Sequence, residues 1–184
     1  MSHRYEQLGY TESASHITSG QEWSRARGAS PLSEIVTTFE RTLQEQGLFG
    51  ALRYLNSTTE YRFTGIYRFE PDWVRSVLLF DRGNPHLQVG KDVPFLDSYC
   101  MLTAQDGDAC TIENSQSDPR LLRHAARESV LSYYAVHLVN PEGLSWGTLC
   151  HFDFIPRRVT DEMRQVFDAV RPAIQRALWA EVGV

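Results

Sequence analysis

The longest strand-like runs of hydrophobic residues lie in the last third of the chain, where single polar side chains interrupt aromatic and β-branched ones. These runs are Ser132–Val139 and Leu144–Phe154. The intervening Asn140–Gly143 places a proline, which fixes φ at the start of a turn, before a glycine, which allows positive φ at its end. The pattern predicts an antiparallel hairpin near the centre of a sheet.

Two further runs, Arg62–Phe69 and Trp73–Asp81, also have the composition of strands, and the short turn Glu70–Asp72 separates them. In the first run, apolar Phe63 and Tyr67 alternate with residues of the opposite face, as side chains in a strand do. These runs predict a second hairpin. The short segment 109–112 predicts one more strand.

Other segments repeat their apolar residues at the three-to-four spacing of a helix. The clearest lie between Pro31 and Gly47 and from Thr160 to about Glu181, and Gly47 is suited to end a helix. Shorter helices are predicted over 48–55, from about residue 98, and over 119–127. The expected fold is α/β, more closely α+β. A central antiparallel sheet of five to six strands carries the N- and C-terminal helices on one face.

Composition limits the kinds of partner. The 184 residues favour one ordinary domain, preceded by a polar, weakly ordered arm over residues 1–30. The net charge of −5 disfavours a nucleic-acid surface. No apolar run approaches the ~20 residues that span a membrane, and the N-terminus does not have the pattern of a signal peptide. We expect a cytoplasmic protein.

The three cysteines, Cys100, Cys110 and Cys150, are odd in number and form no CxxC motif. Metal-type spacing is therefore absent, and a disulfide framework is not expected in a cytoplasmic chain of this size. Buried or half-buried free thiols are the simplest interpretation. A redox role is the alternative.

Several short motifs follow one another along residues 31–181. They are Ser98-Tyr99-Cys100, Ile112–Arg120, Ser132-Tyr133, Glu142-Gly143, Trp146–Cys150, Asp153 and Pro156-Arg157. Together they resemble the GAF domain, a small-molecule sensing module related in fold to PAS domains. The resemblance implies a GAF-like domain over 31–184, either free-standing or part of a larger regulator. The chain departs from the family at His137, where many members have proline.

The resemblance implies a ligand pocket between the sheet and the segments that cross its outer face, namely Leu96–Leu102 and Ile112–Arg120. Aromatic walls are expected from Tyr99, Tyr133, Tyr134, Trp146 and Phe152. The candidate ligand-binding residues are Tyr99, Cys100, Asp118, Tyr133, His137, Cys150 and Asp153. Alternation places Tyr133 and His137 on one strand face and separates Cys150 from His151, but it leaves open which face meets the ligand.

Three of these candidates also have purely structural interpretations. Asp118, followed by proline and arginine, is suited to cap a helix. Asp153 can anchor the turn before Pro156, and His137 can be a hydrogen-bonded core histidine. A metal site built from His137, Cys150, His151 and Asp153 is disfavoured, because metal ligands must converge on one face.

The resulting hypothesis is a non-enzymatic sensor of an unidentified small molecule that needs no cofactor or metal. Its terminal helices would transmit the signal, and a homodimer would form through Leu32–Leu43 and Val166–Trp179. One alternative is the GAF branch that reduces free methionine-(R)-sulfoxide with cysteines, since Cys100 and Cys110 lie ten residues apart, although the glycine-rich surroundings of that branch are missing. Another is an interaction module with a vestigial pocket.

Overall fold

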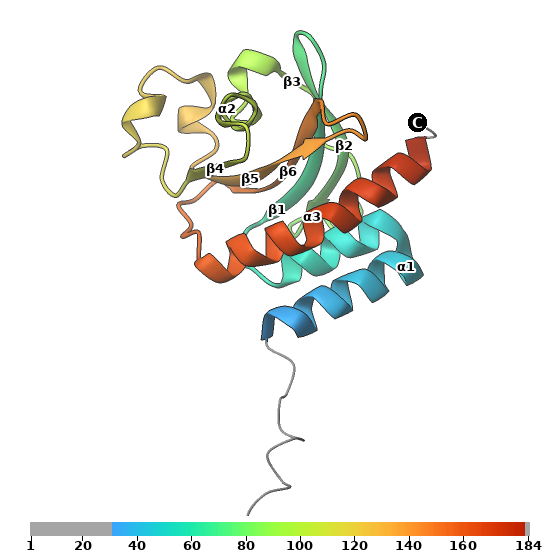
Figure 1. Cartoon of the computed structure of the whole chain (residues 1–184). Helices are drawn as coiled ribbons and strands as arrows, with labels where there is room; N and C mark the ends of the chain where they lie inside the picture. Colours follow the sequence, from blue (N-terminus) through green and yellow to red (C-terminus); the bar gives the residue numbers. More distant parts are fainter. Residues whose placement is uncertain (1–30, 183–184) are drawn as a thin grey trace, which may run out of the picture.

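Figure 1 shows the computed structural model of the chain, which describes residues 31–182. One antiparallel six-stranded sheet has the strand order β3-β2-β1-β6-β5-β4, so the predicted hairpin β5–β6 lies beside the hairpin β1–β2. This confirms the predicted fold class. The strands are β1 (Phe63–Phe69), β2 (Trp73–Asp81), β3 (Val93–Pro94), β4 (Ala109–Ile112), β5 (Ser132–Val139) and β6 (Ser145–Asp153). The predicted arm over residues 1–30 lies outside the described residues.

The helices are distributed over both faces of the sheet. They are α1 (Pro31–Ser57), α2 (Cys100–Asp106), α3 (Asp161–Val182) and the 3₁₀ turns η1 (Phe95–Asp97), η2 (Pro119–Leu121) and η3 (Ala125–Glu128). In Figure 1, α1 and α3 pack side by side on one face, and α2 lies on the other. Gly47 has φ 69° inside α1, so the predicted helix break at this glycine is confirmed.

The helix predicted over 119–127 is wrong, because two 3₁₀ turns occupy this segment. His124 between them has extended backbone (φ −75°, ψ 135°). Asp118 accepts a hydrogen bond from the Arg120 amide, and His124 Nδ1 accepts one from Ala126. Each side chain therefore caps a separate short turn, in competition with a continuous helix.

The main hydrophobic core lies between the sheet and the two long helices. The sheet contributes every second side chain, and α1 and α3 contribute their apolar stripes; the core includes Phe39, Leu52, Leu55, Ile66, Tyr134, Val136, Leu138, Leu149, Val166, Phe167, Val170, Ile174 and Leu178. Each such side chain contributes about 1.5–3 kcal/mol when fully buried. Leu178, which lies in the segment Val166–Trp179 predicted to form part of a dimer surface, is only 1% exposed and belongs to the core of this chain.

A second hydrophobic cluster covers the opposite face of the sheet. Its members come from β1, β2, β4, β5, β6, α2 and their connections, and they include Tyr67, Tyr99, Cys100, Cys110, Ile112, Leu121, Tyr133, Ala135 and Cys150. All three cysteines are free and buried, as expected from the sequence. The sheet therefore separates two apolar layers, and the second contains the chemically distinctive side chains.

Gly147 allows β6 to approach β1 closely. It pairs with Arg68, and a Cβ added at this position would overlap the backbone carbonyl of Tyr67. A backbone carbonyl in a central strand pair cannot move aside as a flexible side chain can. Gly147 is therefore required by close backbone packing.

We predict that Gly147→Ala destabilises the fold by about 3 kcal/mol, because the methyl group forces β1 and β6 apart. Gly143→Ala is the control: Gly143 has φ 77° in an open turn with no neighbouring atom within 4 Å of an added Cβ, so only the backbone cost of about 1 kcal/mol applies. Urea unfolding of both variants measures the difference. Equal losses would show that the steric argument is incorrect.

Candidate functional site

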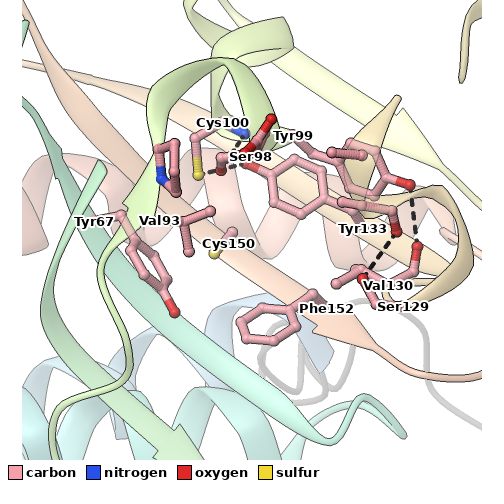
Figure 2. A pocket seen from close by; sticks show the side chains of 14 residues that line it. Tyr67, Val93, Ser98, Tyr99, Cys100, Ser129, Val130, Tyr133, Cys150 and Phe152 are labelled. Atoms are coloured by element: carbon pink, nitrogen blue, oxygen red, sulfur yellow. Dashed lines mark hydrogen bonds between the residues drawn. The ribbon is translucent and has the colours of Figure 1, made fainter. Parts of the chain in front are cut away.

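A cavity of about 330 Å³ lies on the face of the sheet opposite α1 and α3. Figure 2 shows side chains from three directions around it: the strands β1, β5 and β6, the segment that leads into α2, and the connection after η2. The lining residues are Tyr67, Val93, Pro94, Asp97, Ser98, Tyr99, Cys100, Ala125, Ala126, Ser129, Val130, Tyr133, Cys150 and Phe152. This size lies at the lower end of the usual range for small-molecule pockets.

The β5–β6 register decides which side chains meet the cavity. Tyr133 pairs with Phe152 and Ala135 with Cys150, and this face carries the cavity. Tyr134 pairs with His151 on the other face, in contact with α3. The cavity therefore lies on the Tyr133 face of the sheet, which alternation alone could not decide.

Aromatic side chains form the main walls. The rings of Tyr99 and Tyr133 are tilted, with centroids 5.7 Å apart, and the rings of Tyr67 and Phe152 have centroids 6.5 Å apart. The Tyr99 hydroxyl donates to the Val130 carbonyl at 3.2 Å. This bond ties the segment before α2 to the connection after η3, so the two crossing segments hold each other over the sheet.

Buried hydroxyl groups surround the sulfur of Cys100. Tyr133 and Thr148 each donate a hydrogen bond to Cys100 Sγ, both at 3.3 Å. The Tyr133 hydroxyl is also 3.2 Å from Oγ1 of Thr103, one turn further along α2. These bonds fix the first turn of α2 against β5 and β6 and define one end of the cavity.

Burial raises the pKa of several titratable side chains in this layer. It raises the pKa of Tyr67 and Tyr133 well above the usual value, and it does the same for the Cys150 thiol. The pKa of Cys110, behind the wall, is raised to about 12 for the same reason. The two thiols therefore remain protonated, and a protonated thiol is a poor nucleophile.

Four of the seven predicted site residues line the cavity: Tyr99, Cys100, Tyr133 and Cys150. The other three, Asp118, His137 and Asp153, lie outside it and make structural bonds. Asp118 caps η2 and pairs with Arg120 at 2.7 Å. Asp153 accepts from the Arg62 amide at 3.1 Å and pairs with Arg157 at 2.9 Å.

His137 shares the strand face of Tyr133 but lies beyond the cavity, near the hairpin turn. Its Nε2 is 2.7 Å from the Ser145 hydroxyl, and its Nδ1 is 3.2 Å from the Gly107 carbonyl. Both ring nitrogens are therefore occupied by the protein itself. His137 is therefore hydrogen-bonded as the structural interpretation predicts, but it is only half-buried and is not a core residue.

The predicted walls need correction at three places. Tyr134 and Trp146 face the helices, where Trp146 packs against Trp179 with ring centroids 5.0 Å apart. The segment Ile112–Arg120 contributes no lining residue; the connection over residues 125–130 takes that place. Tyr67 also lines the cavity and was not among the predicted wall residues, although the alternation along β1 places it on the same face as Phe63.

His151 is fully buried on the helix face and cannot join Cys150 in a metal site. The Thr64 hydroxyl accepts a hydrogen bond from Asn56 at 2.8 Å and shares another with His151 Nδ1 at 2.7 Å. The imidazole ring packs edge-on against Phe167. No cluster of three or more metal-ligating side chains occurs within residues 31–182.

A second cavity, of about 480 Å³, lies on the helix face near the beginnings of α1 and α3. Side chains of both charge signs border it, and one of them, Arg157, is held by Asp153 and Glu60 at 2.9 and 3.0 Å. Among the described residues, Tyr61 is its one aromatic lining residue, whereas the first cavity has four. The cavity beneath α2 is the better candidate for a small organic ligand.

Solved structures show what this arrangement resembles. The free methionine-R-sulfoxide reductase of Neisseria meningitidis, solved with its substrate, gives a TM-score of 0.65 at 14% identity, over 83% of this chain and 92% of its own. The GAF domain of an Acinetobacter phosphoenolpyruvate-protein phosphotransferase gives 0.65 at 11% identity, over 82% and 94%. The chain has a GAF fold. This confirms the resemblance that the motifs carried.

Other GAF-fold neighbours have different activities. The chromophore-binding domain of the bacteriophytochrome RpBphP3 from R. palustris gives a TM-score of 0.60 at 14% identity, over 82% of this chain and 59% of its own. No protein-family model and no curated protein sequence matches the chain. At these identities the GAF neighbours establish the fold, and function must be argued from the cavity itself.

We predict that the free energy of unfolding falls by roughly 2 kcal/mol between pH 7 and pH 5 through His151. Burial lowers its folded pKa to about 3, below the unfolded value of 6.5, so the unfolded state binds the extra proton within this window. The contribution of His151 to the free energy of unfolding is present above the unfolded pKa of 6.5 and is lost as the pH falls toward the folded pKa. His151→Gln should remove most of this dependence in urea titrations at both pH values.

His124→Gln is the matched control for this experiment. Burial also lowers the pKa of His124, but its side chain is only partly buried, so its share of the pH dependence should be smaller. A His151→Gln variant with the full wild-type dependence would contradict the assignment of the effect to His151.

Proposed function

We propose that this GAF-fold chain is a sensor that binds a small organic molecule in the cavity between the sheet and α2. The observation that carries the proposal is the composition of the wall: aromatic rings and thiols enclose about 330 Å³, with a few hydroxyl groups among them. Binding pockets typically combine apolar walls with a few placed polar groups. The family resemblance, now supported at the level of the fold, implies a ligand pocket on this same face of the sheet.

The strands offer a direct route from the cavity to the terminal helices. On β5, Tyr133 lines the cavity while its neighbour Tyr134 packs on Phe167 of α3, with ring centroids 5.0 Å apart. On β6, Cys150 likewise lines the cavity while its neighbour His151 packs on Phe167. A ligand that displaces β5 and β6 therefore acts on the packing of α3, and we propose this as the signalling path.

Thiol-dependent reduction is the alternative function, because two neighbours in the structural comparison are free methionine-R-sulfoxide reductases. One observation favours the sensor. Burial raises the pKa of Cys110 and Cys150, so these two thiols stay protonated near pH 7 and are poor nucleophiles. Cys100, which lines the cavity, is the thiol that a test of the reductase must address.

We therefore predict no turnover when the protein is incubated with free methionine-(R)-sulfoxide and a thioredoxin reducing system. The readout is NADPH consumption, compared with a protein-free blank and with the variant Cys100→Ser. Turnover that disappears in Cys100→Ser would contradict the non-enzymatic proposal and establish the reductase.

None of the helices within residues 31–182 is long and apolar enough to cross a membrane. The cytoplasmic location expected from the sequence remains a proposal. The homodimer also remains a proposal, and the dimer surface predicted from the sequence needs revision. Because Val166, Ile174 and Leu178 are buried in the core of the same chain, the partly exposed side of α1 around Leu32, Ile35 and Leu43 is the better dimer surface.

We predict a dimer that Leu43→Arg weakens, since a charge in an apolar interface is costly to desolvate. Sedimentation velocity over a range of protein concentrations measures the effect. Glu45→Arg, at an exposed position nearby on α1, is the control for the added charge. Sedimentation at the monomer mass up to high concentration would contradict the dimer.

The ligand itself is tested in two steps. Native mass spectrometry of the purified protein should show a bound molecule, and the same molecule should raise the melting temperature, since a ligand at 100 times its Kd stabilises by about 2.7 kcal/mol. Ala126→Trp, which fills the cavity, should abolish both effects. Leu122→Trp is the control, because Leu122 is 69% exposed and does not line the cavity.

If the ligand still stabilises Ala126→Trp, it binds elsewhere and the proposed site is incorrect. If no metabolite raises the melting temperature of the wild type, the cavity is vestigial and the interaction-module alternative is favoured. A circular dichroism spectrum confirms that each variant is folded before these conclusions are drawn.

A further inference from the structure

The cavity has an unusual distribution of charge for a ligand site. Of its 14 lining residues only Asp97 carries a charge, and its side chain is exposed at the surface. Within residues 31–182, which the structure describes, no lysine, arginine or histidine lines the cavity. An anion that entered would lose its hydration without gaining a cationic partner, and an unpaired buried charge is strongly disfavoured.

The basic side chains behind the wall do not supply the missing positive charge. Arg120 is bound by Asp118 at 2.7 Å, and it also donates to the Thr111 carbonyl at 2.8 Å. Arg127 pairs with Glu128 at 2.8 Å and donates to the Gln116 carbonyl at 2.6 Å. These bonds direct both guanidinium groups to partners outside the lining.

Histidine does not provide a cation either. His124 packs on Tyr99 from outside the lining, with ring centroids 4.7 Å apart, and burial lowers its pKa below the usual 6.5. It is therefore neutral at pH 7. The polar groups that the cavity does offer are hydroxyl groups, among them those of Ser98, Ser129 and Tyr67, which can bond to uncharged polar atoms.

The walls favour molecules of the opposite character. The four aromatic side chains that line the cavity, Tyr67, Tyr99, Tyr133 and Phe152, can stack on an apolar body. Aromatic faces also attract cations, and the carboxylate of Asp97 at the surface adds to that attraction. Anions gain from neither feature.

From this distribution of groups we propose that the ligand carries no negative charge and is a neutral or cationic molecule with an aromatic or aliphatic body. The proposal rests on the proposed sensor function and restricts its ligand class. It disfavours nucleotides, carboxylic acids and the propionate-bearing tetrapyrroles as occupants of this cavity.

Two skeletons, each in three charge states, test the proposal by isothermal titration calorimetry at pH 7. The probes are tryptamine, indole-3-acetamide and indole-3-acetate, and 3-phenylpropylamine, 3-phenylpropionamide and 3-phenylpropionate. For at least one skeleton we expect the amine and the amide to bind at least about tenfold more tightly than the carboxylate. Ala126→Trp should abolish this binding.

A designed gain of function provides the matched control. Ser129 lines the cavity from an exposed position, so Ser129→Lys adds a cation at its edge, and Ser129→Gln adds similar bulk without charge. Ser129→Lys should tighten binding of the carboxylate probes about tenfold, because the added ammonium group pairs with the carboxylate and compensates for its lost hydration. Ser129→Gln should leave carboxylate binding weak.

The outcomes separate the two proposals. Carboxylates that bind the wild type as tightly as the amides, and lose binding in Ala126→Trp, would overturn the charge rule but support the cavity as a ligand site. Binding that persists in Ala126→Trp, or no binding of any probe to the wild type or to Ser129→Lys, would overturn the charge rule and the proposed function together.

Discussion

The register between β5 and β6 is the constraint on which the rest of the structure depends. Side chains alternate along each strand, so the pairing of Tyr134 with His151 assigns one set to the core under α1 and α3. The same register assigns Tyr133, Cys150 and Phe152 to the cavity face. A slip of one residue would exchange the two sets. It would bring His151 into the cavity and a thiol against Phe167, so both the fold and the composition of the cavity wall require this one alignment.

Close packing of the strands supports that register. Gly147 lets β6 approach β1, which places Thr148 opposite Tyr67 and brings its hydroxyl to Cys100 Sγ. The first turn of α2 is thereby fixed over the sheet, and Tyr99 reaches the Val130 carbonyl. The close backbone packing, the hydroxyl bonds to Cys100 and the position of the aromatic wall thus all follow from one strand alignment. The cavity is the part of this sheet face that the crossing segments do not fill.

Much of this could be predicted from the sequence, because local patterns decide it. The turn at Gly143, the break at Gly47 and the strand runs were readable from glycine positions and periodicity, and the motif order implied the fold. Other features depend on individual side-chain bonds and on strand register, which periodicity does not decide. The capping side chain of His124 divided a predicted helix, and the register placed Tyr134 away from the cavity. Asp118 and Asp153 had suitable chemistry for a ligand site, but Arg120 and Arg157, two and four residues further along the chain, pair with them instead.

The most direct test of the central claim, a ligand cavity on the Tyr133 face of the sheet, is a crystal structure of the protein with its tightest-binding small molecule. The account predicts electron density for that molecule between Tyr99, Tyr133 and Phe152, with the opposite face of the sheet still covered by α3. Density instead in the groove beside Arg157, on the helix face, or against the outer surface of α1, would contradict it.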